Sequence, residues 1–150
     1  MKYEKYNLDK FNLHIIQTDK FKKINIKVNF KRKIKREEIT IRRLLVQTLM
    51  ESSLKYPSRR ALEIMTEDLY ALSIGGDNVM SGNYDIISFS TNFLNEKYTE
   101  PGMIKRSIEF LLQVILNPNI KDSKFDLNSL DKAKRIIKDD IISFSDYPTS

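Results

Sequence analysis

The sequence predicts an α+β fold, an antiparallel sheet of about four or more strands with helices packed on one face. Two observations lead to this prediction. Strand and helix patterns come in pairs along the chain, in the order strand, strand, helix, helix, strand, strand, helix, helix. The links between neighbouring strands are short, which favours antiparallel pairing. No linker-like stretch and no repeat of fixed period interrupts residues 1–150, so we expect a single domain.

Two strands are expected first. FNLHIIQT (11–18) alternates apolar and polar residues imperfectly, whereas KINIKVNFKRKI (23–34) alternates cleanly from Lys23 to Lys31. A period of two over that length is typical of a half-buried strand. Its lysines then lie on a solvated face or at a sheet edge, where charge also discourages unwanted strand pairing. The apolar side is formed by Ile24, Ile26, Val28 and Phe30.

Two helices are expected next. Thr40 precedes an apolar helical pattern and is positioned to cap a helix that runs to about Ser52. Ser58, directly after Pro57, is positioned to cap a second helix that ends near Leu72. Apolar residues recur in this second helix at helical spacing: Leu62, Met65, Leu69 and Leu72.

A hairpin is expected around Gly82, between the runs SIGGDNVMSG and NYDIISFSTNFL. In the second run, one side of the strand is formed by Ile87, Phe89, Thr91 and Phe93, and the other by Ile86, Ser88, Ser90 and Asn92. Gly75 and Gly76, which come ahead of it, predict a turn. A phosphate-binding loop is excluded because the sequence contains neither G-x-x-x-x-G-K nor G-x-G-x-x-G.

Two further helices close the pattern. The third opens at Pro101-Gly102 and stops at Asn117-Pro118, because proline cannot continue a helix. Its expected apolar stripe is Ile104, Ile108, Leu111, Leu112 and Ile115. The fourth begins near Asp126 or Ser129 and runs to about Phe144. Its apolar residues are Leu130, Ala133, Ile136, Ile137 and Ile141.

The composition excludes several classes of site. The chain has no cysteine, so it has no disulfide, no thiolate nucleophile and no soft metal site. The single histidine, His14, lies on a predicted strand, and the serines near capping positions have no histidine to activate them. No apolar run reaches the length of a membrane span, and MKYEKYNLDK lacks a signal-peptide core. We therefore expect no cofactor, no membrane association and a cytosolic location.

The net charge of +6 is concentrated near the start of the chain. From Lys20 to Arg36 there are nine Lys or Arg residues and no acid. A basic stretch attracts phosphate, so a nucleic-acid or phosphate-binding module is one alternative function. Proteins that bind single strands place aromatic rings on the basic face, whereas Phe30 falls in the apolar register. We therefore expect this stretch to be a solvated strand face.

Four segments of the chain resemble a known family. They are the strand opening TDKF, the helix before YPSR, the pair Leu69-Tyr70, and the NPNI-to-helix ending. Together they resemble the pitrilysin/insulinase family of inverted-zincin metallopeptidases, over about Phe11 to Ser145, and most closely its bacterial members that have lost the metal motif. The resemblance implies that residues 1–150 are a single, truncated N-terminal domain of that type, because the family's domains are longer. The chain breaks off at SDYPTS, after a helix that further strands should follow.

The family's metal motif is degenerate in this chain. Active members carry H-x-x-E-H on the first helix, where two histidines one turn apart hold zinc and the glutamate takes a proton from the zinc-bound water. Alignment on YPSR places the motif on Arg43, Val46 and Gln47. A guanidinium repels a cation, valine cannot accept a proton, and an amide is a poor zinc ligand. We therefore expect no catalytic, cofactor-binding or metal-binding residue.

The resemblance also implies an acid on a later helix that completes the zinc site. Two registers are open, each of which matches a pair of positions seven residues apart on the last helix. In one register the pair is Ala133 and Asp140, so only the second position has a carboxylate. In the other the pair is Asp131 and Lys138, so only the first position has one. The constellation is incomplete either way, and we expect Asp140 to be an ordinary surface acid. No register can rescue the motif, because one histidine cannot supply two ligands.

The resemblance implies a catalytically inactive zinc-metallopeptidase-like domain, which binds peptide or serves as a non-catalytic subunit or half of a peptidase assembly. An edge strand can add a peptide as an extra strand without any metal. The expected partners are a catalytic peptidase or a second copy of the chain, with a peptide as substrate. Two alternatives stay open: the basic module above, and part of an active zinc peptidase whose metal site lies in another chain or domain.

Overall fold

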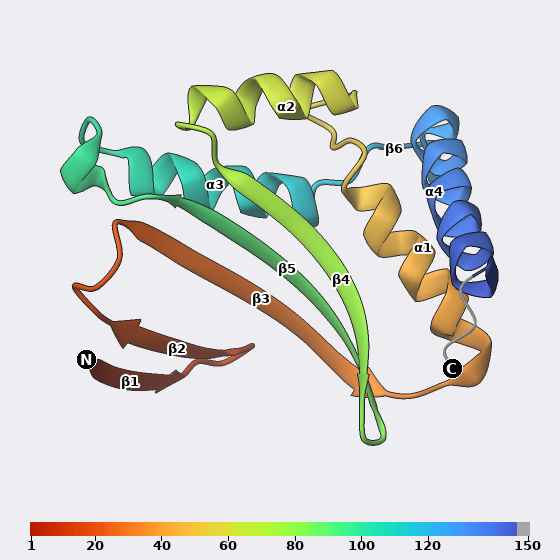
Figure 1. Cartoon of the computed structure of the whole chain (residues 1–150), viewed down its shortest axis with the longest axis horizontal. Helices are drawn as coiled ribbons and strands as arrows, with labels where there is room; N and C mark the ends of the chain where they lie inside the picture. The colour runs from red at the N-terminus through yellow and green to blue at the C-terminus, as the bar shows by residue number, and fades with distance from the viewer. Residues whose placement is uncertain (147–150) are drawn as a thin grey trace.

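The protein has a three-stranded antiparallel sheet with helices on one face and a separate hairpin at the N-terminus (Figure 1). This computed structural model describes residues 1–146. The strands of the main sheet lie in the order β3-β5-β4. They are β3 (Lys23–Lys33), β4 (Ser73–Ser81) and β5 (Tyr84–Leu94). The helices are α1 (Ile39–Leu49), α2 (Arg59–Asp68), α3 (Met103–Leu116) and α4 (Leu127–Asp146). The predicted α+β class is confirmed.

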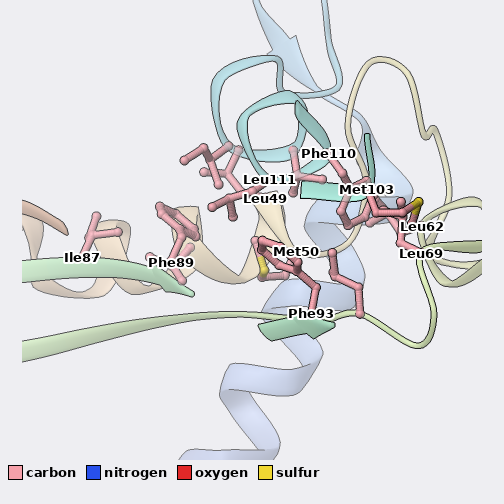
Figure 2. Packing of buried hydrophobic residues seen from close by; sticks show 14 residues of the cluster. Leu49, Met50, Leu62, Leu69, Ile87, Phe89, Phe93, Met103, Phe110 and Leu111 are labelled. Carbon is pink, nitrogen blue, oxygen red and sulfur yellow. The ribbon is translucent and has the colours of Figure 1, made fainter. Parts of the chain in front are cut away.

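The core lies between the inner face of the sheet and the helices. Along β5 every second residue is buried, as the alternation predicts: Asp85, Ile87, Phe89, Thr91 and Phe93. Figure 2 shows the cluster around Phe89 and Phe93, to which the helices contribute Leu49, Met50, Leu62, Met103, Phe110 and Leu111. The predicted hairpin is also confirmed, and Gly82 adopts a φ of 56° at its tip. Within residues 1–146, no helix combines the length and apolar character needed to cross a bilayer.

The N-terminal hairpin includes a strand that the sequence patterns do not predict. Here β1 (Lys2–Asn7) pairs with β2 (Asn12–Gln17), and neither strand pairs with the main sheet in the described residues. The two tyrosines of β1, Tyr3 and Tyr6, are three residues apart and so do not follow a period of two. Both are exposed, which explains why the alternation that reveals a half-buried strand is missing.

Two predicted helix ends differ from the structure. A 3₁₀ turn (Arg36–Glu38) runs directly into α1, so Thr40 lies inside the first turn and is not the cap. That helix ends at Leu49 rather than at Ser52. The predicted cap of α2 is confirmed, since Ser58 Oγ accepts a hydrogen bond from the backbone N–H of Ala61 at 3.1 Å.

The second helix is shorter than predicted because two residues after it leave the helical region. Tyr70 and Ala71 adopt positive φ values of 59° and 55°, so α2 ends at Asp68 instead of near Leu72. The Tyr70 hydroxyl donates a hydrogen bond to Glu100, and Arg106 lies 4.0 Å from the same carboxylate. This contact joins the end of α2 to the start of α3.

The Tyr70–Glu100 contact predicts a pH dependence. The hydrogen bond from Tyr70 lowers the pKa of the Glu100 carboxyl from its ordinary value. A carboxyl with a lowered folded-state pKa stabilises the fold above its unfolded pKa, and that stabilisation is lost as pH falls through the folded value. We expect the pKa of Glu100 to rise in Tyr70→Phe, as followed by NMR titration. An unchanged titration curve would show that the hydroxyl does not bind the carboxylate.

The turn predicted at Gly75 and Gly76 is wrong. Both glycines lie within β4, where Gly75 is opposite Ser90 and Gly76 is opposite Phe89. A Cβ atom at Gly76 would lie 2.7 Å from Cγ1 of Val46, which is too close for a real contact. The close approach of Val46 therefore explains why position 76 is a glycine. Glycine inside a strand often marks such a close approach of another part of the chain.

The apolar stripes of the last two helices are only partly predicted. In α3 the buried residues are Met103, Ser107, Phe110, Leu111, Val114 and Ile115, whereas Leu112 is exposed. Apolar residues lie on most sides of this helix, so periodicity alone does not select the face that meets the sheet. In α4 the predicted Ala133 and Ile137 are buried but Ile141 is exposed. The segment 147–150, which includes most of the SDYPTS ending, lies outside the described residues.

Candidate functional site

The three degenerate motif positions lie in the middle of α1. Arg43 and Gln47 are one helical turn apart and therefore share a face of the helix. Val46 points instead to the sheet, where it is buried with 4% of its surface exposed, against Gly76 of β4 and Phe89 of β5. The position that the resemblance aligns with the catalytic glutamate is thus part of the hydrophobic core in this chain.

The structure brings Arg43 together with Asp140, 97 residues away in the sequence. The helices α1 and α4 lie side by side (Figure 1), and Nη2 of Arg43 donates to Oδ2 of Asp140 at 3.1 Å. The prediction of an ordinary surface acid is therefore incomplete: Asp140 is exposed, but it pairs with the first motif position. Asp131 and Lys138, the positions of the other register, form no ion pair with α1 in the described residues.

This ion pair joins α1 to α4 at the surface of the protein. In the register that the resemblance implies, Arg43 stands at the position of the first zinc ligand. About half of each side chain is exposed, 42% for Arg43 and 51% for Asp140. A pair so exposed contributes at most about 1 kcal/mol to stability. Its positive charge nonetheless disfavours a divalent cation at this position.

The remaining metal-ligating residues do not gather at α1. His14 lies on β2, where its Nδ1 is 2.7 Å from the hydroxyl of Tyr3 and the two rings stack. The structure contains no group of three or more His, Cys, Asp or Glu that could hold a metal ion anywhere in residues 1–146. The chemistry of the side chains on α1 therefore does not fit a hydrolytic zinc ion.

The serines near α1 take part in a buried polar network and not in a hydrolase triad. Ser52 Oγ lies 2.6 Å from Ser129 Oγ and accepts from the Asn119 amide at 3.2 Å. Ser129 in turn donates to Asp126 at 2.9 Å, from both its N–H and its hydroxyl. No imidazole takes part, so nothing in this network activates a hydroxyl as a nucleophile. It joins the end of α1 to the start of α4.

A second arginine anchors α1 to the sheet. Nε of Arg42 lies 2.6 Å from Oδ2 of Asp85 on β5, and Asp85 has only 1% of its side chain exposed. Asn78 of β4 donates to the other carboxylate oxygen. Sequence reasoning missed this pair, although Asp85 continues the buried alternation of Ile87 and Phe89. A charged residue in a core register is the signal that could have revealed it.

The sheet edge beside α1 is open within the described residues. β4 pairs with β5 on one side and with no strand on the other. Val46 of α1 contacts this strand at Gly76, so the degenerate motif and the open edge adjoin each other. An unpaired edge presents a row of backbone N–H and C=O groups to an incoming chain.

No family model matches the chain. It is 24% identical over 127 residues to a curated protein of Bacillus subtilis (strain 168), described as the probable inactive metalloprotease YmfF. The chain is thus similar to a protein described as a probable inactive metalloprotease. The prediction that it lacks peptidase activity of its own agrees with that description, and the metallopeptidase-like relationship is confirmed.

A solved structure shares the fold. The crystal structure of a conserved protein from Enterococcus faecalis V583 superimposes with a TM-score of 0.87 and 29% identity over 91% of the chain. The chain spans less than a third of the length of both relatives, 30% of the Bacillus protein and 32% of the Enterococcus protein.

Proposed function

We propose that the chain is a non-catalytic, peptide-binding domain of the pitrilysin/insulinase type, the N-terminal part of a longer cytosolic protein. In this proposal it holds an extended peptide on the free edge of β4 and does not cut it. A catalytic peptidase partner or a second copy of the chain completes the assembly that encloses the peptide.

The observation that carries the proposal is the pairing of Asp140 with Arg43 on α1, the helix whose Val46 contacts the open-edged strand β4. In the motif register that the resemblance implies, Arg43 supplies a fixed positive charge at the position of the first zinc ligand. Val46 removes the general base from the same helix. The strand beside it keeps its backbone groups free. The site therefore retains what strand addition requires and lacks what hydrolysis requires.

The first test separates binding from cleavage. The purified chain is dialysed against zinc, its bound metal is measured, and a mixture of extended peptides is incubated with it and examined by mass spectrometry. We expect less than about 0.1 zinc per chain and no new peptide termini, since two neutral imidazoles are needed on one helix face. Stoichiometric zinc together with cleavage would overturn the proposal and favour an active peptidase.

The second test locates the bound peptide. We expect hydrogen-exchange protection of residues 73–81 when a peptide is added, because main-chain hydrogen bonds to β4 protect its amides. In an added strand, the backbone N–H groups of every second peptide residue point to β4. Methylating those nitrogens should weaken binding by about tenfold or more, whereas methylating the nitrogens of the residues between them should not. Equal loss from both sets, or no protection of β4, would contradict strand addition.

A further inference from the structure

The outer face of the sheet carries a row of lysines along β3. The residues of this lysine face are Lys23, Lys27, Lys31 and Lys33, and all four are exposed. Asn25 and Asn29 occupy the positions between them. Successive side chains of a strand point to opposite faces, so the lysines stand on the side that the helices do not cover.

The lysine face has no acidic counterpart within residues 1–146. None of its four side chains forms an ion pair in the described part of the chain. The outward residues of β5 are uncharged, and the only outward acid on the described strands of this sheet is Asp77 of β4, two strands away from β3. The positive potential of the face is thus not compensated locally.

The chemistry of this face indicates a polar partner. The central strand β5 presents Ser88, Ser90 and Asn92 outward, between the lysines of β3 and the edge of β4. A face that packs on apolar elements carries apolar side chains. Ile86 and Val79 form an apolar pair on the outer face near the hairpin, but the rest of this face beside β3 carries mainly hydroxyls, amides and ammonium groups. The partner that complements it is polar and negatively charged.

Two kinds of polyanion meet that description, and the aromatic side chains favour a polypeptide over a nucleic acid. Stacking requires exposed rings on the basic face. Phe30 belongs to the inner face, where its ring meets Phe89 edge-on at 6.2 Å. Tyr84 lies on the outer face, but Lys31 Nζ is 4.0 Å from its ring centroid and covers it. Within the described strands β3, β4 and β5, the lysine face therefore has no uncovered ring, and the exposed Phe21 precedes the first residue of β3.

We propose that the lysine face selects acidic polypeptides, so that the substrate class of this chain is an extended peptide rich in Asp or Glu. This inference rests on the proposed peptide-binding function and extends the bound polypeptide beyond the segment that pairs with β4. Because β3 lies two strands from β4 in the order β3-β5-β4, the acidic segment lies along β3 on the outer face and is separate from the segment on the β4 edge. Lys23, Lys27 and Lys31 recur every fourth residue, which is about 13 Å along a strand. An extended peptide with Glu at every fourth position repeats its carboxylates with the same spacing.

The test compares three fluorescent probes by anisotropy: an extended peptide with Glu at every fourth residue, the same peptide with Gln at those positions, and an oligouridylate. We expect the Glu peptide to bind about tenfold more tightly than the Gln peptide. We also expect this difference to shrink with added salt, because the lysines are exposed. Equal affinity of the two peptides, or tighter binding of the oligouridylate, would overturn the assignment.

Matched variants separate the lysine face from net charge. Lys23→Gln with Lys27→Gln removes two charges from the face and leaves Lys31 on Tyr84, whereas Lys132→Gln with Lys134→Gln removes two exposed charges from α4. We expect about a tenfold loss of affinity for the Glu peptide in the first double variant and less than about twofold in the second. Equal losses would refute a specific face.

The two proposals fail in different ways. Protection of β4 by both peptides, without any effect of the lysine variants, would refute acidic selection and leave the peptide-binding function standing. The absence of protection by either peptide would refute the peptide-binding function itself.

Discussion

Replacing Asp85 with alanine is expected to lower the free energy of unfolding by about 3–5 kcal/mol, because it leaves the buried Arg42 guanidinium without its countercharge. The carboxylate has 1% of its surface exposed, and Arg42 has 14%. Nε and Nη2 of Arg42 and Oδ2 of Asp85 are buried without an aligned hydrogen bond in the described residues, so the charge of Asp85, 2.6 Å from Nε, is the main compensation for the guanidinium. Urea denaturation followed by circular dichroism measures the change.

The neighbouring arginine supplies the control for this prediction. Arg43 is on the same helix and also pairs with an aspartate, but its pair with Asp140 is exposed. We expect Arg43→Met to cost less than about 1 kcal/mol. The double variant Arg42→Met with Asp85→Leu should recover much of the loss of Asp85→Ala, because no unpaired charge stays buried. A cost of Asp85→Ala no larger than that of Arg43→Met would show that burial does not govern this pair.

The parts of the fold that sequence reasoning predicts well depend on local rules. The alternation along β5 follows directly from the period of a strand, and the hairpin at Gly82 follows from turn chemistry. Ser58 caps α2 as expected, because a cap is a contact between residues three positions apart. The degenerate motif stays a prediction from residue types, since the sequence contains only one histidine.

The missed features depend on contacts between distant segments. Two registers placed an acid of α4 near the motif, and only the packing of α4 on α1 pairs Asp140 with Arg43. Gly76 has the sequence signature of a turn, but it lies within β4, where the absence of a side chain allows Val46 to pack against the strand. The hairpin of β1 and β2 lacks a buried face, so its sequence carries no alternation. Tertiary context overrides local preference in each instance.

The Gly76→Ala substitution tests the contact that joins the motif helix to the open edge. An added Cβ would lie 2.7 Å from Cγ1 of Val46 and 3.1 Å from two ring carbons of Phe89. Both neighbours are buried, and a valine in a helix has one strongly preferred rotamer, so neither yields easily. We expect a loss of about 1–3 kcal/mol in the free energy of unfolding, the usual cost of overpacking a core. Urea denaturation measures it.

The adjacent glycine and a compensating variant make this prediction specific. Gly75→Ala adds the same atom where nothing lies within 4 Å, so it should be nearly neutral. Val46→Ala alone leaves a cavity. In the double variant with Gly76→Ala, the new Cβ occupies part of that cavity. We therefore expect the double variant to be more stable than the sum of the two single changes predicts, by about 0.5–3 kcal/mol. Strict additivity of the two changes would show that Val46 does not press on β4. The same contact explains why Val46→Glu cannot simply restore a catalytic base, since the carboxylate would replace a buried methyl group against Gly76 and Phe89.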